Sequence, residues 1–255
     1  MMIMKPIIYM FIVSWLIMIA LIICSTNKVL KKEDLNIHYE SNGDSIQGDQ
    51  QVSLCQIQIV MKQIFDRVLA FVAVFLLSPF LLLISICIYI DDPGPVLFLQ
   101  KRVGKNKKLF MIHKFRTMKM STPHDQPTHL LENPSQYITR VGKFLRKVSL
   151  DELPQVWDIL IGKMSFVGPR PALWNQYDLI LERDKYNAND ILPGLTGWAQ
   201  INGRDELEIN VKAKLDGFYV EHMSFNFDIK CLFKTFLKVI KCDGVVEGMP
   251  NQEGK

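Results

Sequence analysis

The chain lacks any cysteine arrangement typical of a disulfide framework or a zinc site. Its 255 residues contain five cysteines, and none of them forms a C-x-x-C pair or another metal-like spacing. Two of the five, Cys24 and Cys87, lie in apolar runs. These absences weigh against a disulfide-bonded secreted protein, and they favour a reduced chain that faces the cytosol.

Charge is missing from residues 7–24, an apolar run of about the minimum length for a transmembrane helix. The run closes on bulky residues, where a signal peptide would have a small-residue cleavage pattern. Lys28, Lys31 and Lys32 follow it, and positive charge on that side favours a cytosolic position for the chain that comes next. We therefore predict an N-terminal transmembrane anchor over 1–26, with a cleaved signal peptide as the alternative.

Charge is also missing from residues 68–90, a run long enough to cross a bilayer. Ser78 and Pro79 stand in its middle, where proline removes a backbone hydrogen bond and a serine hydroxyl can satisfy the freed carbonyl. Arg67 precedes the run and a basic segment follows it, so both ends favour the cytosolic side. This pattern predicts a re-entrant membrane helix within 61–95 that proline breaks. An ordinary kinked spanning helix is the alternative.

Acidic residues are absent from 101–119, a segment that contains eight lysines and arginines. Such a segment is typical of proteins that bind nucleic acid, anionic lipid or a phosphorylated substrate. No recognition-helix pattern or aromatic stacking surface accompanies it. A membrane-tethered nucleic-acid-binding or scaffold protein is therefore the lesser alternative to a phosphate-handling enzyme.

The rest of the chain predicts a mainly helical α+β protein. A polar linker is expected over 27–60, a small β-hairpin over 96–116, a proline-rich loop over 121–136 and a flexible tail over 245–255. Residues 192–204 are rich in turn residues. The lysines of 225–241 form one stripe, which suits a helix in the headgroup plane or a helix packed on a core. Helices are predicted over 137–147, 151–161, 174–183, 206–221 and 225–241.

Asp151 and Glu152 form an adjacent pair of acids at a predicted helix start. Ser149 and Glu152 match a capping box, which would make the glutamate a structural cap. Pro154 favours a later start, because proline is tolerated where its missing N–H is not needed. With Asp151 as the first cap residue, both carboxylates would lie at the mouth of the helix, where phosphate is attracted.

The residues around this pair suit a metal-assisted phosphoryl-transfer site. Mg²⁺ usually takes one or two carboxylates together with substrate phosphates, so Asp151 and Glu152 are candidate ligands. Arg146 and Arg170 can donate to phosphate oxygens, and Arg170 stands between two prolines that restrict its backbone. In such a site, catalysis comes from positioning and charge neutralisation.

From about residue 62 to residue 244 the sequence closely resembles the bacterial sugar transferases, which are monotopic polyprenyl-phosphate phosphoglycosyl transferases. Several ordered motifs carry the resemblance, and any one of them alone would be weak. They follow the proline-containing apolar run and are DPGPVLF (92–98), QKRVG (100–104), KFRTM (114–118), RKVSLDELPQ (146–155), MSFVGPRP (164–171) and LPGLTGWAQINGR (192–204).

The resemblance implies transfer of sugar-1-phosphate from a nucleoside-diphosphate sugar, usually a UDP-sugar, to polyprenyl (undecaprenyl) phosphate. Asp151 is then expected to be a nucleophile that forms a phosphosugar-aspartate. Glu152, with Asp151, is expected to bind Mg²⁺. A single-step ternary mechanism is the alternative. Phosphate-binding roles are implied for Arg146, Arg170, Lys114 and Arg116.

The same resemblance implies a location at the bacterial cytoplasmic (inner) membrane. The catalytic domain, over 96–244, is expected on the cytosolic face, beside a re-entrant helix broken at Ser78 and Pro79. The expected partners are the nucleotide sugar, the polyprenyl phosphate and the lipid bilayer, without nucleic acid. The pathway implied is the building of a surface glycan, such as a capsule, an exopolysaccharide or an O-antigen. Whether the protein forms homo-oligomers is left open.

Overall fold

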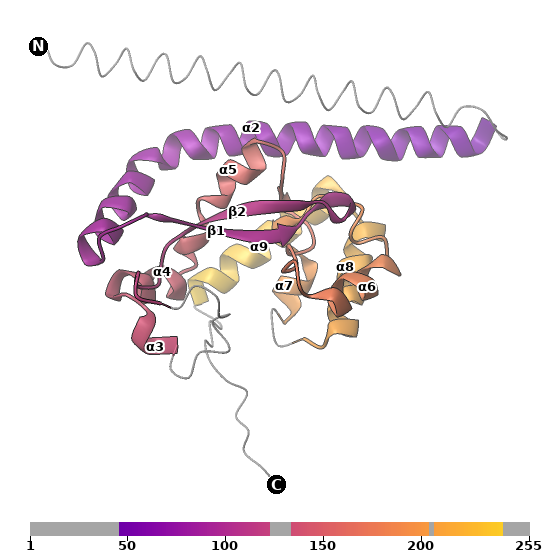
Figure 1. The fold of residues 1–255 in the computed structure, drawn as a ribbon. Helices are drawn as coiled ribbons and strands as arrows, with labels where there is room; N and C mark the ends of the chain where they lie inside the picture. The colour runs from indigo at the N-terminus through magenta and orange to yellow at the C-terminus, as the bar shows by residue number, and fades with distance from the viewer. Residues whose placement is uncertain (1–45, 123–133, 204–206, 242–255) are drawn as a thin grey trace, which may run out of the picture.

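The computed structural model describes residues 46–122, 134–203 and 207–241 (Figure 1). The predicted transmembrane anchor, most of the predicted loop over 121–136 and the predicted tail lie outside these residues. Within them the protein is mostly helical, with two small two-stranded sheets.

The bounds of the elements are as follows. The helices are α2 (Ile46–Asp91), α3 (Pro134–Tyr137), α4 (Arg140–Lys147), α5 (Gln155–Leu160), α6 (Tyr177–Asp184), α7 (Trp198–Asn202), α8 (Ile209–Glu221) and α9 (Phe225–Lys241), with 3-10 turns η1 (Lys105–Lys107) and η3 (Leu150–Glu152). The strands are β1 (Leu97–Val103), β2 (Leu109–Phe115), β3 (Ser165–Val167) and β4 (Gly194–Thr196).

The predicted break at Pro79 is replaced by a bend in a continuous helix. Pro79 lies inside α2, whose axis curves toward β1 in Figure 1. The missing N–H of Pro79 leaves the Phe75 carbonyl without its usual donor, and the Ser78 hydroxyl donates to that oxygen at 2.8 Å. The serine thus keeps the helix intact where proline would otherwise interrupt it. α2 begins at Ile46, so the last part of the predicted linker is helical.

α2 packs on the domain along one narrow stripe. Ala70 is fully buried against α5 and β2, where Ile112, Val156 and Ile159 form the core with it. Other apolar residues of α2 remain exposed, and Ile90 is 74% accessible. By length and composition, Ile57–Asp91 could cross a membrane. A helix with so much apolar surface outside the protein core suits contact with lipid.

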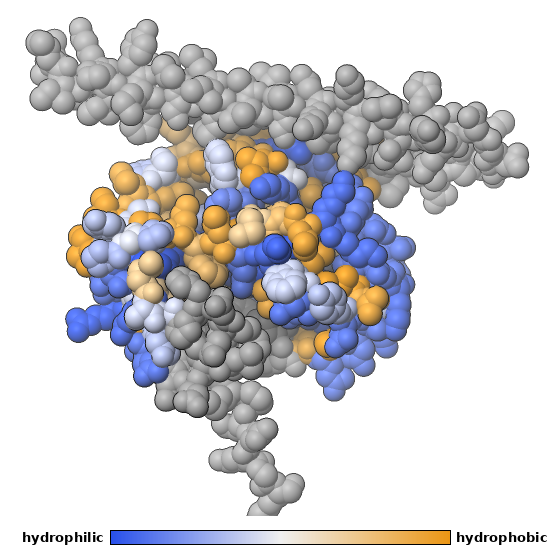
Figure 2. Space-filling model, in the orientation of Figure 1, coloured by the Kyte–Doolittle hydropathy of each residue, from blue (hydrophilic) through white to orange (hydrophobic). Residues whose placement is uncertain are grey.

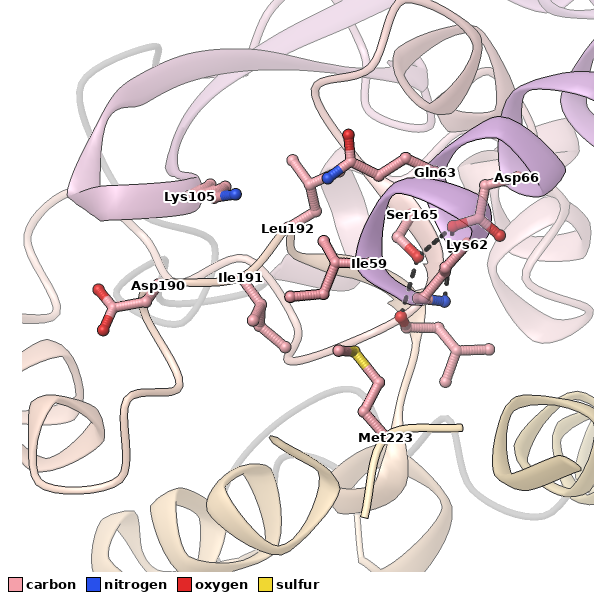
Figure 3. Close-up of a pocket in the computed structure, with 11 residues that line it drawn as sticks. Ile59, Lys62, Gln63, Asp66, Lys105, Ser165, Asp190, Ile191, Leu192 and Met223 are labelled. Atoms are coloured by element: carbon pink, nitrogen blue, oxygen red, sulfur yellow. Dashed lines mark hydrogen bonds and ion pairs between the residues drawn. The ribbon is translucent and has the colours of Figure 1, made fainter. Parts of the chain in front are cut away.

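A polar network fastens the first half of α2 to the domain. Lys62 pairs with Asp228 of α9 and, at 3.5 Å, with Asp66. Ser165 of β3 donates to Asp66 at 2.6 Å, and Tyr219 donates to Asp228 at 2.7 Å. Figure 3 shows Lys62, Asp66 and Ser165 at one end of a small hollow of about 40 Å³. Because these groups satisfy one another, we assign them a structural role.

β1 and β2 pair antiparallel, from Leu97 opposite Phe115 to Val103 opposite Leu109. The small sheet predicted over 96–116 is therefore present. In this register the even-numbered residues of both strands share one face, and Arg102 and Lys114 lie on it. Asp158 of α5 covers the outer edge of β2 by accepting the His113 backbone N–H at 2.9 Å.

Apolar side chains remain exposed on the other face of this sheet. Leu99, Leu109 and Met111 are each more than one third accessible. Figure 2 shows hydrophobic residues across the middle of the visible surface, between hydrophilic regions. Large apolar side chains are thus exposed both on α2 and on this face of the sheet.

The predicted helices are present, with shifted ends. The helix predicted over 225–241 matches α9 at both ends, and α6 and α8 begin three residues later than predicted. The predicted helix over 137–147 is divided between α3 and α4. The turn-rich segment 192–204 contains β4 and α7, and β4 pairs in parallel with β3. Neither three-residue strand was predicted.

Gly168 and Gly194 allow the parallel β3–β4 pair to close. A Cβ atom on Gly194 would lie 2.1 Å from the Gly168 nitrogen, so the two backbones can approach this closely only without side chains. The closed pair leads directly into Pro169, whose carbonyl accepts the Gly194 N–H at 2.9 Å.

We predict that Gly194→Ala lowers the free energy of unfolding by about 1–3 kcal/mol, because the added methyl group must push two backbones apart. Thermal unfolding of the detergent-solubilised protein measures the change. Gly104→Ala is the comparison and should destabilise less, since a Cβ there would meet the Phe110 ring at 3.0 Å and the Lys108 carbonyl at 3.1 Å rather than a backbone atom at 2.1 Å. Equal stability of Gly194→Ala and wild type would contradict the prediction.

Candidate active site

The acid pair lies in a tight turn rather than at the start of an α-helix. Asp151 and Glu152 belong to η3, and α5 begins only at Gln155. The predicted start at Asp151 is therefore wrong, since Pro154 occupies the cap position of α5, where its missing N–H costs nothing. Ser149 has a left-handed backbone with φ of 57° and makes no side-chain cap. The alternative of a capping box is thus excluded.

Glu152 is the centre of the strongest charge cluster at this turn. Arg170 donates two hydrogen bonds to its carboxylate, from Nη2 to Oε1 at 2.6 Å and from Nη1 to Oε2 at 3.2 Å. Lys114 of β2 donates to one of the same oxygens at 2.9 Å. Three segments distant in sequence thus meet at one carboxylate. Two cations hold it ionised, and the bidentate contact fixes the orientation of Arg170.

The two neighbouring acids have opposite pKa shifts. Burial, followed by the negative charge of Glu152, raises the pKa of Asp151 from 3.8 to about 6. Burial also acts to raise the pKa of Glu152, but Arg170 and Lys114 outweigh it and hold that pKa well below its usual range. Carboxyl groups whose pKa values are driven apart are typical of sites where each has its own role.

Arg146 of α4 lies close enough to Asp151 for its charge to act on this carboxyl group. Its Nε donates to the Thr117 hydroxyl at 2.7 Å, and its positive charge lowers the Asp151 pKa. Lys114 has a pKa lowered by burial, an effect that the charge of Glu152 opposes. The structure therefore brings together five of the candidate site residues: Asp151, Glu152, Lys114, Arg146 and Arg170.

Arg116 does not contact this cluster, and its predicted phosphate-binding role stays a prediction. Its guanidinium donates to the Asp92 carbonyl and pairs with the Asp92 carboxylate at 3.3 Å. β2 ends at Phe115, so the alternation that directs Lys114 into the cluster stops before Arg116. Arg116 instead ties the end of β2 to the segment after α2.

Two residues that were not predicted as site residues lie beside the cluster. Arg102 and Gln155 line a narrow hollow together with Lys114 and Arg170, and this hollow has no room for a water molecule. Gln155 is 1% exposed, and its side-chain nitrogen has no hydrogen-bond partner. Arg102 and Lys114 share one face of the β1–β2 sheet, and this relation could have predicted Arg102 as a site residue. It depends on the register of the two strands, which the sequence alone does not give.

Several lysines and arginines of the basic segment 101–119 make hydrogen bonds or ion pairs with other residues of the protein. Arg102 donates to the Pro171 carbonyl at 2.9 Å, and Lys107 pairs with Asp184 at 3.0 Å. Lys114 and Arg116 are paired as described above. The segment is therefore not a uniform exposed basic surface, and this argues against the nucleic-acid alternative.

The donor set is small for a metal site made by protein alone. Within the described residues, no group of three or more His, Cys, Asp and Glu side chains could hold a metal ion. Asp151 and Glu152 supply two carboxylates at most. This number fits Mg²⁺, which takes one or two acids and completes its shell with water and substrate phosphates.

Residues 57–242 match the family described as bacterial sugar transferase. This span covers most of the chain and contains α2 from residue 57 onward, the charge cluster and the Pro-Arg-Pro segment. The chain belongs to the bacterial sugar transferase family.

Individual relatives agree with this assignment. The chain is 36% identical over 187 residues to the uncharacterized sugar transferase EpsL of Bacillus subtilis (strain 168), covering 73% of this chain and 91% of EpsL. It is 38% identical over 207 residues to a UDP-glucose:undecaprenyl-phosphate glucose-1-phosphate transferase of Escherichia coli (strain K12), covering 78% of this chain and 44% of that protein.

A third sugar transferase relative acts on a different sugar. The chain is 34% identical over 186 residues to a UDP-N-acetylgalactosamine-undecaprenyl-phosphate N-acetylgalactosaminephosphotransferase of Aeromonas hydrophila. The match covers 71% of this chain and 44% of that protein. The chain thus spans less than half the length of the two relatives whose names state a reaction.

The raised pKa of Asp151 has a consequence for stability. The folded protein keeps this proton up to about pH 6, whereas the unfolded chain releases it near the ordinary value of 3.8. The stabilisation is therefore complete below about pH 4 and is lost as the pH rises through about 6.

We predict that Asp151→Asn raises the free energy of unfolding at about pH 8 by up to about 3 kcal/mol, and changes it little at about pH 4. Thermal unfolding at both pH values, without divalent cations, provides the measurement. Asp178→Asn, on the exposed surface of α6, is the matched control. If Asp151→Asn were instead less stable than wild type at the higher pH, the ionised Asp151 carboxylate would not destabilise the folded protein, and the prediction would be wrong.

Proposed function

We propose that this sugar transferase moves sugar-1-phosphate from a UDP-sugar to polyprenyl phosphate, such as undecaprenyl phosphate, and releases UMP. The observation that supports this best is the charge cluster, which offers two acids and three cations to a diphosphate. The names of the Escherichia coli and Aeromonas hydrophila relatives support the same substrates. Because those two names state different sugars, the cluster is assigned to the phosphates rather than to the sugar ring.

Asp151 is the proposed nucleophile. One carboxylate oxygen attacks the phosphorus that bears the sugar, and the bond from this phosphorus to the bridging oxygen breaks. The electron pair leaves with UMP, and an aspartyl-phosphosugar remains. A pKa of about 6 supports this role, because the carboxylate is ionised at neutral pH yet is a stronger nucleophile than an ordinary aspartate.

Polyprenyl phosphate completes the proposed reaction. An acceptor oxygen attacks the same phosphorus, the bond to Asp151 breaks, and the carboxylate is restored. A phosphate monoester has a second pKa of about 6, so the acceptor is already anionic and needs no general base. This agrees with a site where Lys114, Arg146 and Arg170 supply charge and no histidine adjoins the acids among the described side chains.

Asp151 and Glu152 are the residues that would hold Mg²⁺. A divalent cation bound there would neutralise charge on the donor diphosphate. In the present arrangement the Glu152 carboxylate is bonded to Lys114 and Arg170. The phosphates of an arriving substrate are proposed to take over these two cations, which frees Glu152 to serve as a ligand.

The site is proposed to work at the cytosolic face of the bacterial inner membrane. The exposed apolar residues of α2 supply the membrane contact, and its bend at Pro79 is proposed to return the chain to the side from which it entered. A product carried on polyprenyl diphosphate suits the first membrane step of a surface glycan pathway.

We expect Asp151→Asn to reduce turnover at least about a thousandfold, because the amide cannot form the intermediate. The assay is release of UMP from UDP-sugars in the presence of undecaprenyl phosphate. In parallel, a donor with a radiolabelled sugar phosphate should label the wild type in the absence of acceptor. Label absent from an active wild type would favour the single-step mechanism, with Asp151 holding the metal. Asp178→Asn again serves as the control.

Membrane topology is tested by labelling with a membrane-impermeant thiol reagent. Met61 precedes the uncharged run and Lys101 follows it, and both side chains are exposed. In a cysteine-free background, Met61→Cys and Lys101→Cys should both react from the cytosolic side of the membrane. Reaction from opposite sides would show that α2 spans the bilayer.

A further inference from the structure

The Pro169–Arg170–Pro171 segment is held through its carbonyl oxygens. Prolines have no N–H, so the oxygens are the main backbone groups by which this segment can be positioned. The Pro169 oxygen accepts from the Gly194 N–H, the Arg170 oxygen from Arg183 Nη1, and the Pro171 oxygen from Arg102 Nη1, each at 2.9 Å. Three consecutive carbonyls are thus bound by three different elements.

The contact from Arg183 differs from the other two because it requires the burial of an ion pair, which costs desolvation free energy. Arg183 of α6 is 2% exposed, and its partner Asp216 of α8 is 1% exposed. Arg183 Nε and Nη2 lie 2.8 and 2.6 Å from one Asp216 oxygen, while Nη1 points away to the Arg170 carbonyl. Burying such an ion pair costs desolvation that apolar residues of the same size would avoid. Stability alone therefore does not account for it.

The geometry connects this buried pair to the charge cluster. Arg183 Nε donates to Asp216, Nη2 lies in ion-pair contact with the same oxygen without a hydrogen bond, and Nη1 holds the backbone of Arg170. The side chain of Arg170 then makes its bidentate contact with Glu152. Arg183 itself does not line the hollow beside Glu152. Its influence on the site therefore passes through the position of Arg170.

We propose that Arg183, oriented by Asp216, is a positioning residue that sets the Arg170 guanidinium for the substrate phosphates. This rests on the proposed function, in which Arg170 passes from Glu152 to a phosphate. Such a transfer needs a backbone that stays in place while the side chain changes partner. A displacement of about 1 Å in a reacting group can cost about a hundredfold in rate, so a rigid anchor matters here.

The test is a double-mutant cycle between Arg183 and Arg170. Arg183→Lys keeps the charge beside Asp216 but cannot hold both Asp216 and the Arg170 carbonyl in the same way. We expect it to lower kcat/KM for the UDP-sugar about tenfold when Arg170 is present, and less than about twofold in the Arg170→Ala background. An equal loss in both backgrounds would overturn the proposal, because a merely structural defect acts whether or not Arg170 is present.

A second variant guards against misfolding. Asp216→Asn retains Arg183 and weakens its orientation, so it should show the same dependence on Arg170. The matched control is Asp184→Asn, which removes the ion pair from α6 to Lys107 at 3.0 Å without touching Arg170. Its kcat/KM should remain within about twofold of wild type.

A measurement without turnover separates this proposal from the proposed function. In protein labelled with ¹⁵N-arginine, the Nε–H resonance of Arg170 should move in Arg183→Lys and Asp216→Asn, and stay in place in Asp184→Asn. An unchanged Arg170 resonance would refute the positioning role even if the wild type transfers sugar phosphate. A resonance that moves in these two variants, together with a wild type that releases no UMP, would instead refute the proposed function and leave the positioning role standing.

Discussion

The ion cluster at Glu152 is the contact on which the arrangement of the site depends. One carboxylate brings together β2 through Lys114, the η3 turn, and the Pro-Arg-Pro segment through Arg170. No two of these segments are neighbours in sequence. Burial, followed by the negative charge of Glu152, raises the pKa of the adjacent Asp151, whereas Arg170 and Lys114 outweigh burial at Glu152 and lower its pKa. The division of the pair into a firmly ionised acid and a more basic one therefore follows from burial together with the pairing of both cations to Glu152.

The rest of the fold supports this cluster from several directions. α5, which follows the acids, packs under α2 through Ala70 and Ile159. The polar contacts of Lys62 hold α2 against α9, and the close approach of Gly168 and Gly194 places Pro169. Because α2 carries the apolar surface that suits lipid, the same contacts link this surface to the acids. The proposed polyprenyl phosphate acceptor would require such a link.

Local patterns in the sequence predicted much of this structure. The periodicity of 225–241 predicted both ends of α9. The Ser78–Pro79 pair predicted that the serine hydroxyl donates to the carbonyl that proline leaves without an N–H donor. The β3–β4 pair was missed, because a strand of three residues has no measurable alternation. The helix after Asp151 was placed too early, since the tight turn at Ser149 depends on a left-handed backbone that serine seldom adopts.

The sequence by itself determined the chemical inventory of the site: adjacent acids, an arginine between prolines, and a basic segment in the order typical of the bacterial sugar transferases. It also determined the uncharged run of α2, because length and charge are properties of the chain alone. Only the tertiary structure decided which cation meets which acid. Lys114 reaches Glu152 whereas Arg116, two residues later, turns to Asp92, and Arg102 and Arg183 hold the segment around Arg170. The physical reason is that ion pairs act over a few ångströms, and residues far apart in the chain come that close only when the backbone has folded.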